Sequence, residues 1–192
     1  MYKRQAWDTR KAPDLTIEAF LRAFDADDPV TLVVKTTRMI SSWWTQSAIE
    51  RHTWWQVMDV VKRHRRPASV LLHTDELTDQ EVAGLIHRCD CFLSLTRAEG
   101  WGLGAFDAAT LGKPVIMTGH GGQLDFLGTD HPGLVPFTMV TANHPNTSLF
   151  DDRMTWAEPD LDAAVELLRE AFHGDRLQRD AAARAPGIQA RF

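Results

Sequence analysis

Hydrophobic residues recur along this chain in two alternating patterns. Residues 14–24 and 47–64 carry them at helical spacing, and each segment is followed by a short apolar run of strand length, at residues 29–36 and 68–74. In the second helical segment the spacing places Trp54 among the residues that face the core. The repeated order predicts helices that pack against strands.

A third unit carries its own helix start signal. Thr78 and Glu81 have the spacing of a capping box, which predicts a helix that begins at Asp79. Further apolar runs of strand length follow at residues 91–95, 114–118 and 133–137. Strands separated by helices predict right-handed crossovers, so the expected fold is α/β and Rossmann-like, a parallel sheet with helices on both faces.

The last part of the chain has a different pattern. An amphipathic helix is expected from about Leu161, and the polar, alanine-rich residues after it predict a final helix that frays, a helical tail from about residue 175. Residues 141–154 show no periodicity and predict a long loop, which is uncommon in a compact domain unless it is functional or mobile. The length suits one domain, residues 1–192.

Composition narrows the class of protein. The formal net charge is −5, so no basic excess favours nucleic acid as a partner. No run approaches the ~20 apolar residues of a membrane span, and the N-terminal residues show no apolar signal core. Cys89 and Cys91 begin an apolar run, which favours buried reduced thiols over metal ligands and indicates a cytoplasmic protein. No metal or cofactor is assigned, because the histidines form no i, i+4 pair.

A glycine-rich stretch at residues 96–126 holds the candidate chemistry. It follows an expected strand, and in α/β sheets ligands bind outside the carboxyl ends of the strands. Gly100, Gly102 and Gly104 let the backbone approach a ligand closely, and the free N–H groups of the next helix suit a phosphate. On spacing alone, purely structural turns are an equal alternative.

Two acidic residues flank this loop. Glu99 precedes it and Asp107 lies early in the helix after it, so both side chains can face one cleft from either side of bound phosphates. An acidic residue near a helix N-terminus also favours the helix itself, and this purely structural role of Asp107 remains an alternative.

Three segments, taken in order, are similar to one enzyme family. Residues 94–127, SLTRAEGWGLGAFDAATLGKPVIMTGHGGQLDFL, resemble the E-x7-E region of retaining glycosyltransferases of the GT-B fold, family 4, also called group 1. Residues 9–24 resemble that family's R-K-G element and the helix after it, and residues 156–169 its segment after the last strand. The resemblance implies one half of a GT-B fold, which binds a nucleotide-diphosphate sugar for glycosyl transfer to an acceptor with retention.

The resemblance also implies roles for individual residues. Lys11, with Arg10 beside it, would hold the donor diphosphate and stabilise the charge that develops on it, and Glu99 would bind donor-sugar hydroxyls. Asp107 would hold the ribose hydroxyls. The backbone that would contact the sugar and phosphate comprises Gly100, Trp101, Gly102, Leu103 and Gly104. Thr36 and Leu77, at strand ends, are weaker candidates for the wall around the nucleobase.

Some positions depart from the family pattern. Asp107 replaces the usual second Glu and is one methylene shorter, and Gly104 stands where Pro is usual. The family's second diphosphate cation usually lies six residues before the lysine, where this chain has Gln5. Which of Gln5, Arg4 and Lys3 serves, if any, is open at this stage.

The family pattern also implies a partner. A GT-B enzyme has a second, N-terminal domain that binds the acceptor, so we expect this chain to be the donor-binding half, cut away or encoded separately, and inactive alone. Such enzymes often touch membranes through basic patches, so residues 62–67, KRHRRP, could bring a cytoplasmic protein to the inner membrane face, although a solvated helix end is the simpler reading. The alternative function is a non-catalytic nucleotide or sugar-phosphate binding module on the same fold.

Overall fold

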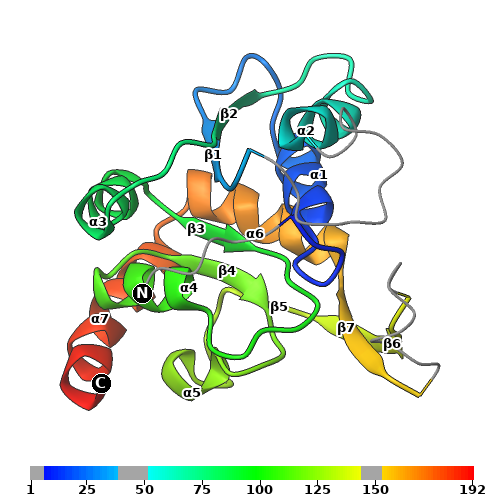
Figure 1. The fold of residues 1–192 in the computed structure, drawn as a ribbon. Coiled ribbons are helices and arrows are strands. Elements are labelled where there is room, and N and C mark those ends of the chain that lie inside the picture. Colours follow the sequence, from blue (N-terminus) through cyan, green and yellow to red (C-terminus); the bar gives the residue numbers. More distant parts are fainter. Residues whose placement is uncertain (1–6, 39–51, 144–152) are drawn as a thin grey trace.

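The computed structural model describes residues 7–38, 52–143 and 153–192. Helices and strands alternate through most of this length, as the sequence predicts (Figure 1). The helices are α1 (Pro13–Ala23), α2 (Thr53–Val61), α3 (Asp79–Arg88), α4 (Leu103–Thr110), α5 (Leu124–Leu127), α6 (Leu161–His173) and α7 (Arg176–Arg191). The strands are β1 (Thr31–Lys35), β2 (Ser69–His73), β3 (Phe92–Ser94), β4 (Val115–Thr118), β5 (Leu134–Val135), β6 (Phe137–Thr141) and β7 (Thr155–Pro159).

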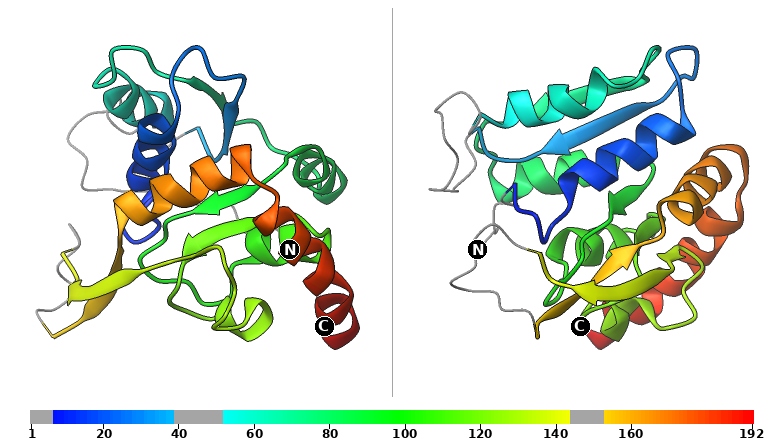
Figure 2. Two further views of the ribbon diagram at one scale, coloured as in Figure 1. Left: turned by 180° about the vertical axis from the view of Figure 1, so that it is seen from behind. Right: turned by 90° about the vertical axis from the view of Figure 1, so that its right-hand side faces the viewer.

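The strands form two parallel sheets and one antiparallel hairpin. Strands β1 and β2 pair in parallel, with Thr31 opposite Ser69, and β3, β4 and β5 form a second parallel sheet in that order. Helix α4 covers one face of the β3–β5 sheet and α6 the opposite face (Figures 1 and 2). The predicted α/β, Rossmann-like class with helix-flanked parallel strands is confirmed. Among the described residues, however, the parallel strands form two separate sheets, β1–β2 and β3–β4–β5, and not one.

Two hydrophobic cores hold these layers together. The larger lies between α1, α2, α6 and the strands, and Ile17, Phe20 and Leu95 are among its buried members. The smaller joins α4, β4, α5 and α7 around small alanine side chains, including Ala105 and Ala108. Alanine at the contact lets α4 and α7 pack closely, which fixes the glycine-rich loop before α4 against the C-terminal helix.

Helix α2 buries a different face from the one predicted. Its buried residues are Thr53, Val57 and Val60, whereas Trp54 is 45% exposed and packs edge to face on Trp55. The assignment of Trp54 to the core is therefore wrong. The buried residues do have the predicted three-to-four-residue spacing, but the buried face begins at Thr53 instead of Trp54. The Thr53 side chain can be buried because its hydroxyl donates to the backbone oxygen of Arg38 at 2.9 Å.

The hairpin of β6 and β7 is not predicted by the sequence. It runs from the pair Phe137–Pro159 to the pair Thr141–Thr155 and projects from the body of the molecule (Figure 1). Strand β6 is exposed on most positions, so it lacks the alternation that marks a half-buried strand. Of the described residues in the predicted loop 141–154, only Thr141 belongs to a strand, and residues 144–152 lie outside the described part.

Helix α7 is packed rather than frayed. Leu177, Ala181, Ala185 and Ile188 are buried along one face, and the helix continues to Arg191 although Pro186 lies inside it. The expectation of a fraying tail was therefore wrong, because alanines every fourth residue form a stripe too weakly hydrophobic to stand out. Within the described ranges, no helix is both long and apolar enough to cross a membrane.

Candidate functional site

Lys11 and Glu99 meet in an ion pair although 88 residues separate them in sequence. Lys11 lies two residues before α1, and Glu99 lies five residues beyond the end of β3. The Lys11 ammonium donates to Oε2 of Glu99, and the two side chains are only 18% and 13% exposed. The sequence placed both residues in one site, and the structure brings their charged groups together at the carboxyl end of β3.

The backbone after Lys11 is strained. Ala12 adopts φ 45° and ψ 51°, the left-handed region, and is fully buried as the N-terminal cap residue of α1. Among non-glycine residues in the described part of the chain, Ala12 is alone in having a positive φ. For an L-residue this conformation costs about 1–2 kcal/mol, and such strain is typical of functional turns. Pro13, first in α1, then fixes the direction of the helix.

The Arg10 side chain bonds to the backbone of the segment that contains Glu99. Its Nη1 donates to the carbonyl oxygen of Ala98 at 2.5 Å, and its own N–H donates to the Asp8 carboxylate at 2.8 Å. The sequence assigned Arg10 to the diphosphate beside Lys11. The structure places its guanidinium against the residue that precedes Glu99, so part of its donor capacity is already used.

The glycine loop has the geometry that its spacing suggests. Gly102 has φ 85° and stands at the N-terminus of α4 with no side-chain cap, so the first N–H groups of α4 have no side chain over them. A Cβ on Gly102 would lie 3.5 Å from Cγ of Glu99. At Gly104 a Cβ would lie 2.9 Å from the ring of Phe92, so the proline that the family pattern has there would require this ring to shift.

Trp101 and Leu103 differ in their surroundings. The Trp101 ring belongs to an aromatic cluster, with ring centroids 5.8 Å from Phe106, 5.3 Å from Phe126 and 5.2 Å from Phe192. Leu103 is 44% exposed. The side chain of Trp101 therefore anchors the loop, and its backbone is the part that faces the Glu99 segment.

Asp107 lies on the fifth residue of α4, beyond its first turn. Burial raises the pKa of its carboxyl group, and no side chain in the described part of the protein bonds to that group. The alternative that Asp107 serves only to stabilise the helix N-terminus is disfavoured by this position, because the dipole effect falls off within the first turn. A half-buried carboxylate without a partner is costly to keep and suits a ligand contact.

A second glycine turn supports the Glu99 loop from the end of β4. Gly122 N donates to Glu99 O at 3.0 Å, and a Cβ at Gly122 would lie 2.0 Å from the oxygen of Gly100, so only glycine fits. The fully buried Gln123 holds this turn by donating from Nε2 to Thr118 O at 2.8 Å and to His120 O at 2.7 Å. Sequence reasoning missed Gln123, since a lone glutamine beside glycines carries no pattern.

The two residues predicted for the nucleobase wall lie beyond the strands of a different sheet. Thr36, which is buried, follows β1, and Leu77 precedes α3, so both belong to the β1–β2 sheet rather than to the sheet that leads to Glu99. Lys3, Arg4 and Gln5 lie outside the described residues.

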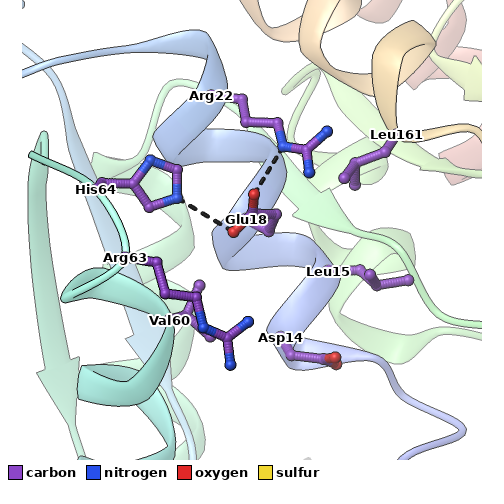
Figure 3. A pocket seen from close by; sticks show the side chains of 8 residues that line it. All are labelled: Asp14, Leu15, Glu18, Arg22, Val60, Arg63, His64 and Leu161. Atoms are coloured by element: carbon purple, nitrogen blue, oxygen red, sulfur yellow. Dashed lines mark hydrogen bonds and ion pairs between the residues drawn. The ribbon is translucent and has the colours of Figure 1, made fainter.

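A surface pocket of about 330 Å³ lies elsewhere, between α1, α2 and α6 (Figure 3). None of its lining residues belongs to the predicted site. Glu18 lies at its centre and bonds to both Arg22 and His64, while Arg63 pairs with Asp59. Burial alone would raise the pKa of Glu18, but its hydrogen bonds to Arg22 and His64 outweigh that and lower it. The central carboxylate of this pocket is thus already bonded to two of its lining side chains.

Metal binding is not indicated for the described ranges. They contain no group of three or more His, Cys, Asp or Glu side chains that could hold an ion. Both cysteines are free thiols; burial raises the pKa of Cys89, and it raises that of Cys91 to about 12. A raised pKa lowers the fraction of thiolate, which is the form that binds metals and acts as a nucleophile.

Comparison with known proteins places the fold. No family model matches the chain, and no curated protein matches it in sequence. Among solved structures, HepE of Anabaena in complex with UDP-glucose superposes with a TM-score of 0.64 and 14% identity over 97% of this chain and 43% of its own. The α,α-trehalose 6-phosphate synthase from Burkholderia multivorans gives 0.61 and 14% over 97% and 36%. The GtfA/B complex gives 0.55 and 18% over 98% and 34%.

These neighbours are glycosyltransferases of the GT-B class. At such identities the likeness shows the fold alone. This chain spans about 34% to 43% of the length of those three structures, and its fold is that of one half of a GT-B protein.

Proposed function

We propose that this chain binds the nucleotide-diphosphate sugar of a retaining glycosyltransferase of family 4, as its donor-binding half. The observation that carries the proposal is the Lys11–Glu99 ion pair beside the uncapped N-terminus of α4. One cation, one carboxylate and a row of free N–H groups are the contacts that a diphosphate and a sugar need. The GT-B neighbours, one of them in complex with UDP-glucose, support the choice of ligand class.

The ion pair gives a simple account of donor binding. A diphosphate that enters beside Lys11 competes with Glu99 for the ammonium group, because both are anions. Once Lys11 bonds to the diphosphate, the Glu99 carboxylate is free to accept hydrogen bonds from the sugar hydroxyls. Lys11 then stabilises the negative charge that grows on the diphosphate as the glycosidic bond breaks. The N–H groups of α4 reinforce this, since the positive end of the helix dipole favours the same charge.

Asp107 completes the donor contacts. Its carboxylate has no side-chain partner among the described residues, and it lies about 7.5 Å along α4 from Gly102 at a rise of ~1.5 Å per residue. That spacing suits a ribose at the far side of a diphosphate bound over the helix N-terminus. We assign the ribose hydroxyls to Asp107, the sugar and phosphate contacts to the backbone from Gly100 to Gly104, and the base to the side of Thr36 and Leu77.

A second domain belongs to this proposal. The acceptor and the groups that orient it would come from a second, N-terminal half, because the fold here matches only one part of the neighbouring structures. We further propose a cytoplasmic location, which two free cysteines suit, with contact at the inner membrane face through residues 62–67.

Calorimetric titration with UDP and UDP-glucose, followed by the ADP and GDP counterparts, tests the proposal. Lys11→Ala should weaken binding of the diphosphate about 10-fold or more, the range for a charge-assisted hydrogen bond, and the loss should shrink in high salt. Lys62→Ala is the matched control, since Lys62 pairs with Asp59 on the surface and should change nothing. Absence of binding by the wild-type chain across this panel, or an unchanged affinity of Lys11→Ala, contradicts the proposal.

A further inference from the structure

Arg97 joins three separate segments beside the candidate site. Its Nε and Nη2 donate to the two carboxylate oxygens of Glu158 at 2.6 and 2.9 Å, and its Nη1 donates to the backbone oxygen of Thr9 at 2.5 Å. Its guanidinium carbon lies 5.0 Å from the ring centre of Trp156. The planar guanidinium group of Arg97 thus donates to two groups from opposite ends of the chain, the Glu158 carboxylate and the Thr9 carbonyl.

The backbone of Arg97 extends the same connection. Its N–H donates to Arg10 O at 2.8 Å, and its carbonyl accepts from Ala157 N at 3.0 Å. Residues 9 and 10 are therefore hydrogen-bonded to Arg97 on one side, and strand β7 is hydrogen-bonded to it on the other. Lys11 is the next residue after the first contact, and Glu99 is two residues after Arg97 itself. Both members of the ion pair are attached to this one side chain and its peptide groups.

We infer that Arg97, held by Glu158 and Trp156, is a positioning residue that keeps Lys11 in register with Glu99 for donor binding. The inference rests on the proposed function for the ligand and on the geometry for the role. The strained turn at Ala12 supports it, because a left-handed alanine persists only where the surrounding structure imposes it. Arg97 acts through Lys11 and touches no part of the proposed ligand.

The planar geometry of the Arg97 guanidinium group, rather than its charge, is what positions Lys11. Lysine carries the same charge, but its three donors sit on one nitrogen and do not reproduce the planar spread by which Nε and Nη2 reach Glu158 while Nη1 reaches Thr9. Arg97→Lys should therefore weaken binding of UDP-glucose nearly as much as Arg97→Met, about tenfold. A residue that acted on the diphosphate by charge alone would keep most of its effect as lysine. Glu158→Gln, which retains one acceptor oxygen, should show a smaller loss of the same sign.

A double-mutant cycle separates positioning from general weakening of the fold. If Arg97 acts through Lys11, the tenfold loss from Arg97→Met should fall below threefold when Lys11 is already alanine. Arg184→Met is the matched control. Arg184 also bonds to two carboxylates, of Asp130 and Asp180, but on α7, so this variant should lower stability and leave the affinity unchanged.

A second measurement needs no ligand. Acetic anhydride labelling followed by mass spectrometry should modify Lys11 more slowly than the exposed Lys62, because Lys11 is mostly covered and paired. Arg97→Met should raise the Lys11 rate severalfold, and Arg184→Met should not. If Arg97→Met does not fold, Glu158→Gln gives the same readout, since Glu158 lies nearer the surface.

The outcomes separate the two proposals. Wild-type binding with unchanged affinity and unchanged Lys11 labelling in the Arg97 variants overturns the positioning role alone. Additive losses in the cycle also overturn it. If the wild-type chain binds no nucleotide, the proposed function fails, and the Lys11 labelling rate then decides whether Arg97 positions this lysine.

Discussion

Asp107 is kept in the fold at a cost in stability. Its carboxyl group is partly buried, which raises its pKa, and no ion pair to it is found in the described ranges. A residue that serves packing alone would not need a partly buried carboxylate without a partner. The nearby Arg97–Glu158 pair shows the contrast, because there both charges are matched by a bidentate contact.

Asp107→Asn should raise the free energy of unfolding at pH 7 and weaken nucleotide binding. A raised carboxyl pKa means that ionisation opposes folding above the unfolded pKa of 3.8, and that the effect disappears below it. The stability gain of the variant should therefore shrink as pH falls from 7 toward 4. Urea unfolding across this range, with titration of UDP at pH 7, measures both effects. Equal stability at pH 7 with unchanged affinity contradicts this assignment.

Ala12 shows what sequence reasoning cannot reach at this scale. Nothing in its type signals a left-handed conformation, which alanine rarely adopts, yet it is fully buried with φ 45°. Lys11 and Glu99 were found because the order of motifs resembles a known family. Arg97 and Gln123 were missed, because their roles depend on acceptors contributed by distant segments, such as Thr9 O and Thr118 O.

At the scale of elements, the helices differ in how their N-termini are capped. The N-terminus of α3 has both halves of the capping box that the sequence predicted, and the Asp160 carboxylate caps α6 by accepting from Asp162 N and Ala163 N, each at 3.0 Å. The N-terminus of α4 has Gly102 and no side-chain cap. Helices α3 and α6 thus satisfy part of their own N–H groups, whereas α4 shares its lack of a side-chain cap with α1, α5 and α7, so its N-terminus points to a ligand only together with the Lys11–Glu99 pair beside it.

Thr78→Ala should lower the free energy of unfolding by about 1 kcal/mol and leave nucleotide affinity unchanged. The threonine oxygen accepts from Glu81 N, and the loss of such a cap typically costs 0.5–2 kcal/mol. Urea unfolding gives the first quantity and calorimetry the second. A changed affinity would show that the start of α3 is coupled to the site, contrary to this expectation.

Element prediction succeeded where one hydrophobic pattern dominates. The capped start of α3 and the apolar β4 strand, buried at every position, are read directly from the residues. The β6–β7 hairpin could not be predicted in this way, because most of β6 is exposed and its strands pair through backbone hydrogen bonds that leave no hydrophobic pattern. In the predicted strand at residues 133–137, Pro136 separates β5 from β6, since proline donates no backbone bond.

At the scale of the whole molecule, the proposed function makes the candidate site one wall of a cleft between two domains. The Lys11–Glu99 pair, the α4 N-terminus and Asp107 all belong to the half described here, and each is a donor contact under the proposed function. The three solved structures compared with this chain are more than twice its length, so acceptor contacts are expected from residues beyond this fold. Under the proposed function, donor binding and acceptor binding are thereby divided between two bodies.

We expect this chain alone to bind UDP-glucose or another nucleoside-diphosphate sugar weakly and to transfer nothing. Positioning of the reactants can supply ~7–11 kcal/mol of barrier reduction, and one wall cannot position an acceptor. Water also enters an open site, and the higher dielectric weakens the contacts of Lys11 and Glu99 with the donor, so micromolar or poorer affinity is expected. Incubation with radiolabelled nucleotide sugars and candidate acceptors measures transfer, and the Lys11→Ala chain serves as the binding control. Multiple turnovers by the wild-type chain alone would show that these 192 residues hold a complete active site, and the division between two bodies would then be wrong.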